Sequence, residues 1–132
     1  MDEMKDLRWR QRFENFEKSY LLLDKYSHKE INNELKRGGV IQFYVRTIEL
    51  AWKVLKDYLE AQGYIVKTPR ETIKQAFQIE IINDGHIWLD ALAKRNITTN
   101  TYDDALAKKL LEDITDLYLP ELTNLYEKLL KE

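Results

Sequence analysis

Residues 40–62, with the sequence VIQFYVRTIELAWKVLKDYLEAQ, decide the fold. Apolar side chains recur along this stretch at alternating steps of four and three residues, which places them on one face of a helix. One stripe comprises Ile41, Val45, Ile48, Trp52, Leu55 and Leu59. A second stripe beside it comprises Val40, Tyr44, Ala51, Val54 and Tyr58. An apolar face this broad predicts a helix at the centre of a bundle or at a subunit contact.

Charged residues and glycines set the expected limits of this central helix. The predicted solvent side consists of Arg46, Glu49, Lys53, Lys56, Asp57 and Glu60. Gly38 and Gly39 predict a break before the helix, and Gly63 predicts its C-terminal stop, because glycine adopts the backbone conformations that interrupt and end helices.

Helical patterns continue on both sides of the central helix. Upstream, residues 7–26 carry an apolar face made of Trp9, Phe13, Phe16, Tyr20 and Leu23. Downstream, Thr68-Pro69-Arg70-Glu71 has the form of a capping box with proline at the first helical position, which predicts a short helix. Asp84 predicts the cap of a further helix through Arg95. A final helix is expected from residues 101–104 onward, with a kink at Pro120.

These elements together predict one all-α domain over residues 1–132. Only 4 glycines and 2 prolines interrupt the chain, while 33% of the residues are charged and 44% are hydrophobic, which is typical of helices with one apolar and one charged face. The predicted architecture is an up-and-down four-helix bundle with a short additional helix.

Composition narrows the function classes. The 21 basic and 23 acidic residues give a net charge of -2, so no overall field attracts nucleic acid or an anionic membrane. The lack of cysteine excludes disulfides and thiolate zinc sites. No stretch approaches the ~18 apolar residues of a membrane span, and the charged start of the chain does not resemble a signal peptide. A cytoplasmic protein is therefore expected.

Common motifs of phosphate and metal chemistry are missing from the sequence. No glycine is followed by serine and the only glycine pair is Gly38-Gly39, so neither a P-loop nor a dinucleotide-binding fingerprint is present. The two histidines, His28 and His86, have no clustered ligands nearby in the sequence and are expected at the surface. We expect no metal site on this chain.

The segment Arg95-Asn96-Ile97-Thr98-Thr99-Asn100-Thr101-Tyr102 gathers a cation, amides, hydroxyls and a phenol between two expected helices. Such a set is suited to bind a phosphate or a base, and the candidate binding residues are Arg95, Asn96, Thr98 and Tyr102. Helix capping is the alternative, in which Asn100 closes the preceding helix while Thr101 and Asp104 cap the last one. Local physical chemistry alone favours capping.

Several runs of residues occur in the order and spacing of a known family. They are residues 48–59 (IELAWKVLKDYL), Pro69-Arg70-Glu71, Asp84-Gly85 with Trp88-Leu89-Asp90, and Arg95-Asn96-Ile97-Thr98 with Thr101-Tyr102. From Phe13 to Tyr118-Leu119-Pro120, the chain thus resembles the nucleotidyltransferase substrate-binding protein family.

This resemblance implies a helical bundle of the HEPN superfamily, whose members commonly form homodimers and are encoded beside a minimal nucleotidyltransferase. The separate partner would use Mg²⁺ and a nucleoside triphosphate, and the present chain would carry no cofactor. The expected function is that of a non-catalytic substrate-binding subunit of a two-protein system, so the chain is expected to be a binding module and not an enzyme. The broad apolar face around Trp52 would serve both the core and a dimer seam.

The resemblance extends to HepT-type toxins of toxin–antitoxin pairs, which implies an alternative function as a ribonuclease acting on RNA. Their motif of arginine, histidine and tyrosine corresponds here to Arg95, Asn100 and Tyr102. An amide cannot exchange a proton near neutral pH, so Asn100 predicts weak or absent cleavage. In related pairs the nucleotidyltransferase adenylylates the motif tyrosine, so Tyr102 is either an acceptor for AMP or an aromatic residue that packs on the bundle.

Overall fold

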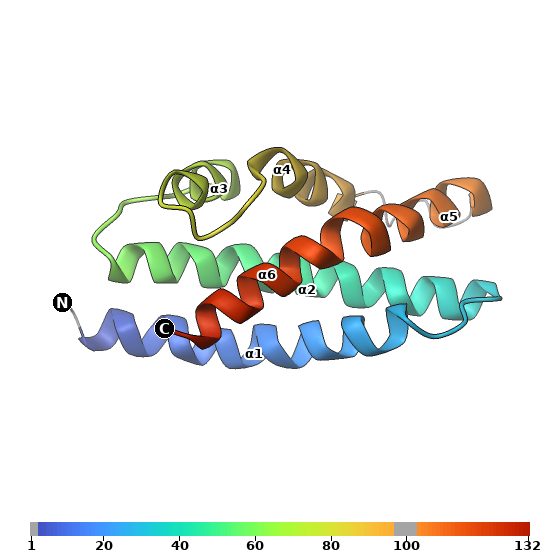
Figure 1. The fold of residues 1–132 in the computed structure, drawn as a ribbon, viewed down its shortest axis with the longest axis horizontal. Helices are drawn as coiled ribbons and strands as arrows, with labels where there is room; N and C mark the ends of the chain where they lie inside the picture. Colours follow the sequence, from blue (N-terminus) through green and yellow to red (C-terminus); the bar gives the residue numbers. More distant parts are fainter. Residues whose placement is uncertain (1–2, 97–102) are drawn as a thin grey trace.

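The computed structural model describes residues 3–96 and 103–132, which form an all-α bundle (Figure 1). The helices are α1 (Glu3–Ser27), α2 (Glu34–Ala61), α3 (Pro69–Gln78), α4 (Gly85–Lys94), α5 (Asp104–Asp113) and α6 (Leu119–Leu130). Between α5 and α6 lies a π-helical segment, η2 (Ile114–Tyr118). The predicted fold class is confirmed, although α4 has 10 residues and is no longer than α3.

Helix α2 lies at the centre of the bundle, as its broad apolar face predicts. It contacts α1, α3, α4 and α5, and it runs antiparallel to α1 (Figure 1). Both predicted stripes face the core, with Val45 and Trp52 only partly buried. Asp57 departs from the prediction, because it is buried in an ion pair with Arg12 and does not lie on the solvent side.

The start of α2 differs from the prediction, because Gly38 and Gly39 lie inside the helix and do not interrupt the chain. The side chain of Asn33 accepts a hydrogen bond from the Lys36 amide at 2.9 Å and caps a helix that begins at Glu34, six residues before the expected start. This cap and the apolar face that follows outweigh the cost of two helical glycines, about 1 kcal/mol each relative to alanine. Gly63 does follow the helix end, with a left-handed φ of 96°.

The two predicted caps of the middle helices are confirmed. The Thr68 hydroxyl accepts a hydrogen bond from the Glu71 amide at 3.1 Å, and the Glu71 carboxylate in turn accepts from the Lys67 amide at 2.9 Å. The Asp84 carboxylate accepts from the amide of His86 at 3.0 Å. These contacts satisfy amides that the first turn of each helix leaves without intrahelical partners.

The last helix begins and bends differently from the simplest expectation. Asp103, and not Asp104, caps α5, since its carboxylate accepts from the Leu106 amide at 3.1 Å. Thr101, the other predicted cap, lies outside the described residues. Pro120 lies in the first turn of α6, directly after the π-helical segment. Since proline has no amide hydrogen to donate, the irregularity expected at Pro120 takes the form of η2 just before it.

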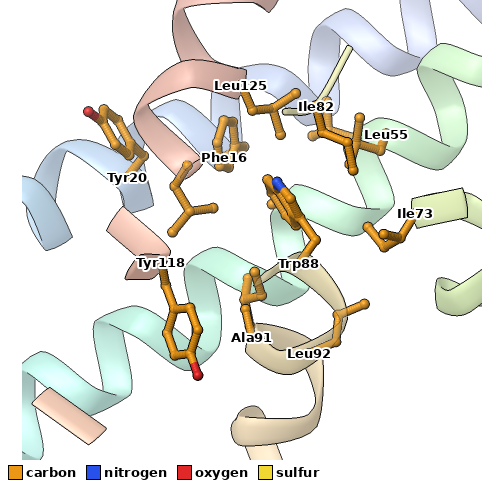
Figure 2. Packing of buried hydrophobic residues seen from close by; sticks show 14 of the residues in the cluster. Phe16, Tyr20, Leu55, Ile73, Ile82, Trp88, Ala91, Leu92, Tyr118 and Leu125 are labelled. Atoms are coloured by element: carbon orange, nitrogen blue, oxygen red, sulfur yellow. The ribbon is translucent and has the colours of Figure 1, made fainter. Parts of the chain in front are cut away.

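The core is centred on a tryptophan from α4. Trp88 is 1% exposed and lies among side chains that include Leu55 of α2, Leu125 of α6 and Ile82, which belongs to the connection between α3 and α4 (Figure 2). Its indole nitrogen is buried without a hydrogen-bond partner in the part of the chain that the structure describes. Apolar burial rather than hydrogen bonding therefore fixes this side chain.

Candidate functional site

Arg95, the first residue of the polar segment noted in the sequence, lies at the C-terminal end of α4. Its Nη1 atom is 2.9 Å from Oε1 of Glu49 on α2, and the two side chains are 24% and 35% exposed. A cation at this end of a helix is also favoured by the helix dipole. The ion pair holds the predicted site arginine against the central helix, partly shielded from water.

The second carboxylate oxygen of Glu49 is engaged as well. Trp52, one turn further along α2, donates a hydrogen bond from its indole Nε1 to Oε2 of Glu49 at 3.2 Å. Residues three apart lie on the same side of a helix, which allows this contact within α2. With both oxygens engaged, Glu49 has a defined orientation toward Arg95.

Two stacked tyrosines hold α4 close to this ion pair. The rings of Tyr44 on α2 and Tyr118 on η2 have centroids 5.5 Å apart and an interplanar angle of 21°. The Tyr44 hydroxyl donates to the Ala91 carbonyl at 2.5 Å, and the Tyr118 hydroxyl donates to the Asp90 carboxylate. Both acceptors belong to the C-terminal half of α4, so the tyrosines fix the half of the helix that leads to Arg95.

Burial raises the pKa of both tyrosines well above the usual range. For Tyr44, loss of hydration is the largest cause, followed by the neighbouring Tyr118 and Asp90. For Tyr118, loss of hydration is again the largest cause, followed by its hydrogen bond to Asp90. Both phenols therefore stay protonated near neutral pH and act as hydrogen-bond donors, not as groups that transfer protons.

The π-helical segment contributes to this arrangement. Ile114 and Tyr118, its first and last residues, are 0% and 1% exposed. Residues four apart share one face of a helix, and π-helical segments are frequent at functional sites. Through η2, the chain presents Tyr118 to α4 and then continues into α6.

The predicted site residues are only partly within the described chain. We call Tyr44, Glu49, Asp90, Arg95 and Tyr118 the polar cluster. Asn96 follows Arg95 as an exposed residue, and Thr98, Asn100 and Tyr102 lie outside residues 3–96 and 103–132. The assignment of these residues to a binding site stays a prediction.

Sequence reasoning missed the partners of Arg95 and of α4. Glu49 was expected in solvent and Trp52 in the apolar stripe, although their spacing of three residues was a signal that they share a helix side. No sequence pattern pairs Asp90 with Tyr118, because the two residues come from separate helices. The observed cluster combines one guanidinium, two carboxylates and two protonated phenols, which suits binding of a charged group more than bond breaking.

A hollow of about 410 Å³ lies near the opposite end of α4. Its lining comprises Ile73, Lys74, Phe77, Asn83, Asp84, Gly85, His86 and Leu89. The ten residues of α4 span about 15 Å at 1.5 Å per residue. The hollow and the polar cluster around Arg95 are therefore separate features of the surface.

Both histidines lie at the surface, as predicted. His28 is exposed with Nε2 at 3.1 Å from Asp24, and His86 is exposed in the first turn of α4. Among residues 3–96 and 103–132, no three or more histidine, aspartate or glutamate side chains are grouped so as to hold a metal ion. Over the same ranges, no helix combines the length and the apolar character needed to cross a membrane.

Comparison with known proteins identifies the family. The family described as nucleotidyltransferase substrate binding protein like matches residues 11–131. A crystal structure of a protein from Thermus thermophilus is similar, with 27% sequence identity and a TM-score of 0.74, covering 88% of this chain and 96% of that one. None of the curated proteins matches. Because the family match extends over nearly the whole sequence, including every residue of the polar cluster, the chain belongs to the nucleotidyltransferase substrate-binding protein-like family.

Proposed function

We propose that this chain is the non-catalytic, substrate-binding subunit of a two-protein minimal nucleotidyltransferase. The observation that carries the proposal is the family match over residues 11–131. The separate catalytic chain would supply the nucleoside triphosphate site and the Mg²⁺ ions, because metal ions held by carboxylates neutralise the charge of a triphosphate during transfer.

The surroundings of Arg95 support a binding role. A guanidinium donates paired hydrogen bonds to two phosphate oxygens, and the partly exposed Arg95 is held in place by Glu49. We assign phosphate binding to Arg95 together with Asn96, Thr98 and Tyr102, of which the last two belong to residues 97–102. The helical bundle then positions the ligand, and the catalytic chain performs the transfer.

Co-expression with the minimal nucleotidyltransferase gene that we expect beside this one tests this function. We expect the two chains to co-elute in size exclusion chromatography at low and at moderate salt, with each chain run alone as the control. The elution volume of the helical chain alone also reports whether it is the homodimer that the family resemblance implies. Separate elution of the two chains at low salt would contradict the proposal.

We further propose that the catalytic partner modifies Tyr102. The phenolic oxygen of Tyr102 would attack the α-phosphate of ATP, form an O–P bond and release pyrophosphate, while the phenolic proton passes to solvent. Mass spectrometry after incubation with ATP, Mg²⁺ and the partner should locate AMP on Tyr102. Tyr64 is the control, because it is a tyrosine outside the motif and its side chain is 37% exposed. Tyr102→Phe should abolish the label and Tyr64→Phe should keep it; label on Tyr64 would contradict the assignment.

The alternative function is that of a HepT-like ribonuclease, and the residue that would transfer the proton in such an enzyme is replaced here. Asn100 stands where the toxin motif has histidine, and an amide does not accept a proton near neutral pH. An RNA cleavage assay should therefore show no cleavage by the native chain. Cleavage by the native chain that is lost in Arg95→Ala would reverse this preference.

A further inference from the structure

In the Glu49–Arg95 ion pair, a carboxylate of the chain itself lies where a bound anion would contact the guanidinium. We propose that the Glu49 carboxylate is an internal competitor, which a ligand with a phosphate or pyrophosphate group must displace from Arg95, and that Trp52 reports the exchange. This inference rests on the proposed function, because it specifies how the binding site of a nucleotidyltransferase subunit is regulated.

Glu49 occupies the position that a ligand oxygen needs. Its Oε1 atom is 2.9 Å from Nη1 of Arg95, which is the separation of a close ion pair. The planar fork of a guanidinium fits two oxygens of a phosphate as well as it fits a carboxylate. A phosphate group carries more negative charge than a carboxylate at neutral pH, so it competes effectively for the same donors.

The exposure of the pair allows the exchange. The side chains of Arg95 and Glu49 are 24% and 35% exposed, so the Glu49 carboxylate reaches water when it is displaced, and its departure would uncover the Nη1 atom of Arg95, which is buried in the pair. The Arg12–Asp57 pair differs, because the Asp57 side chain is 7% exposed and a buried carboxylate left without its partner is strongly unfavourable. Of these two pairs between helices, Glu49–Arg95 is the one whose carboxylate already has access to solvent.

Trp52 links the exchange to an optical signal. Its indole Nε1 donates to Oε2 of Glu49 at 3.2 Å, so movement of Glu49 changes the surroundings of this indole. Trp9 and Trp88 are 2% and 1% exposed and make no hydrogen bond to Glu49. We therefore assign to Trp52 any change in tryptophan fluorescence that accompanies anion binding at Arg95.

Titration of the purified chain with inorganic pyrophosphate, at constant ionic strength, tests the exchange. Glu49→Gln should bind pyrophosphate roughly threefold to tenfold more tightly than the native chain, because the competing charge is gone. Glu60→Gln is the matched control: Glu60 pairs with Lys56 on the same helix at 2.5 Å, so this variant removes the same charge and should keep the native affinity. Arg95→Gln should bind about tenfold more weakly, or worse.

The Trp52→Phe variant separates pyrophosphate binding from the fluorescence change that accompanies it. Isothermal titration calorimetry should show pyrophosphate binding by this variant, while its tryptophan fluorescence no longer responds. Far-ultraviolet circular dichroism of each variant checks that the fold is retained. Equal affinities of Glu49→Gln and Glu60→Gln would overturn the inference, since only total charge would then matter. Native affinity in Arg95→Gln would also overturn it, because the anion would then bind elsewhere.

Failure of the exchange is distinguishable from failure of the proposed function. The titration uses the isolated chain, whereas the proposed function is tested by co-elution with the catalytic chain. Co-elution combined with equal affinities of Glu49→Gln and Glu60→Gln rejects the exchange alone. Separate elution combined with tighter binding by Glu49→Gln rejects the partner function alone.

Discussion

The two halves of α4 are held in the bundle by different kinds of interaction. In the first half, Trp88 is 1% exposed and its indole nitrogen has no hydrogen-bond partner among the described residues. In the second half, hydroxyls of Tyr44 and Tyr118 and the carboxylate of Glu49 make polar contacts that lead to Arg95. Apolar burial is non-directional, whereas hydrogen bonds require defined geometry. The first half therefore mainly provides stability, and the second half sets the position of Arg95.

Replacing Trp88 should have the largest effect on stability. Trp88→Ala removes a fully buried side chain and should lower the free energy of unfolding by about 3–5 kcal/mol, measured by chemical denaturation. Trp52→Ala is the matched comparison, because Trp52 is only partly buried, and it should cost clearly less. Similar losses in both variants would show that the burial of Trp88 does not give the first half of α4 a special role in stability.

The apolar half of this contrast could be predicted from the sequence. The spacing of Ile87, Trp88 and Leu92 has the periodicity of a helix. Asp84 predicts the start of that helix, because an aspartate side chain can cap two free amides. Periodicity reports which residues are buried, and burial decides the fold class. For the same reason the central position of α2 was predictable from its two apolar stripes.

The polar half could not be predicted in the same way. Tyr44 and Tyr118 lie at apolar positions in the helical pattern, and nothing local indicates that their hydroxyls find Ala91 and Asp90 on another helix. Glu49 was expected in solvent, since periodicity says nothing of a cation that approaches from α4. Contacts between elements depend on how the helices pack, and packing is not encoded in the spacing along one helix.

Tyr44→Phe should have the next largest effect. The variant keeps the ring that stacks on Tyr118 but leaves the buried Ala91 carbonyl without its donor, so the free energy of unfolding should fall by about 1–3 kcal/mol. Tyr20→Phe is the control, because Tyr20 pairs with the hydroxyl of Thr123, which is able to reorient toward water. Tyr20→Phe should therefore lose less free energy of unfolding than Tyr44→Phe. An equal loss would show that the hydrogen bond from Tyr44 to α4 contributes no more than the one between Tyr20 and Thr123.

The same variant should change the response to alkaline pH. The pKa of Tyr44 is raised above its ordinary value of 10.0, mainly by burial, so the folded state favours the protonated phenol. The corresponding stability is fully present below pH 10 and is lost as the pH rises toward the folded-state pKa. Between pH 10 and 11, the free energy of unfolding should fall less steeply in Tyr44→Phe, by up to about 1.4 kcal/mol per pH unit. An equally steep fall of the free energy of unfolding with pH in the native chain and in Tyr44→Phe would contradict the expectation.

The smallest effect on stability is expected for Glu49→Gln, the variant that should tighten pyrophosphate binding. Glu49→Gln removes one member of a partly exposed ion pair and should change the free energy of unfolding by only about 0.5 kcal/mol or less. Asp57→Asn is the comparison, because its carboxylate is 7% exposed, and it should cost more, about 1–2 kcal/mol. If Glu49→Gln instead loses as much stability as Asp57→Asn, then Glu49 is part of the structural framework. In that case it could not leave Arg95 for a phosphate, and the two halves of α4 would differ in chemistry but not in role.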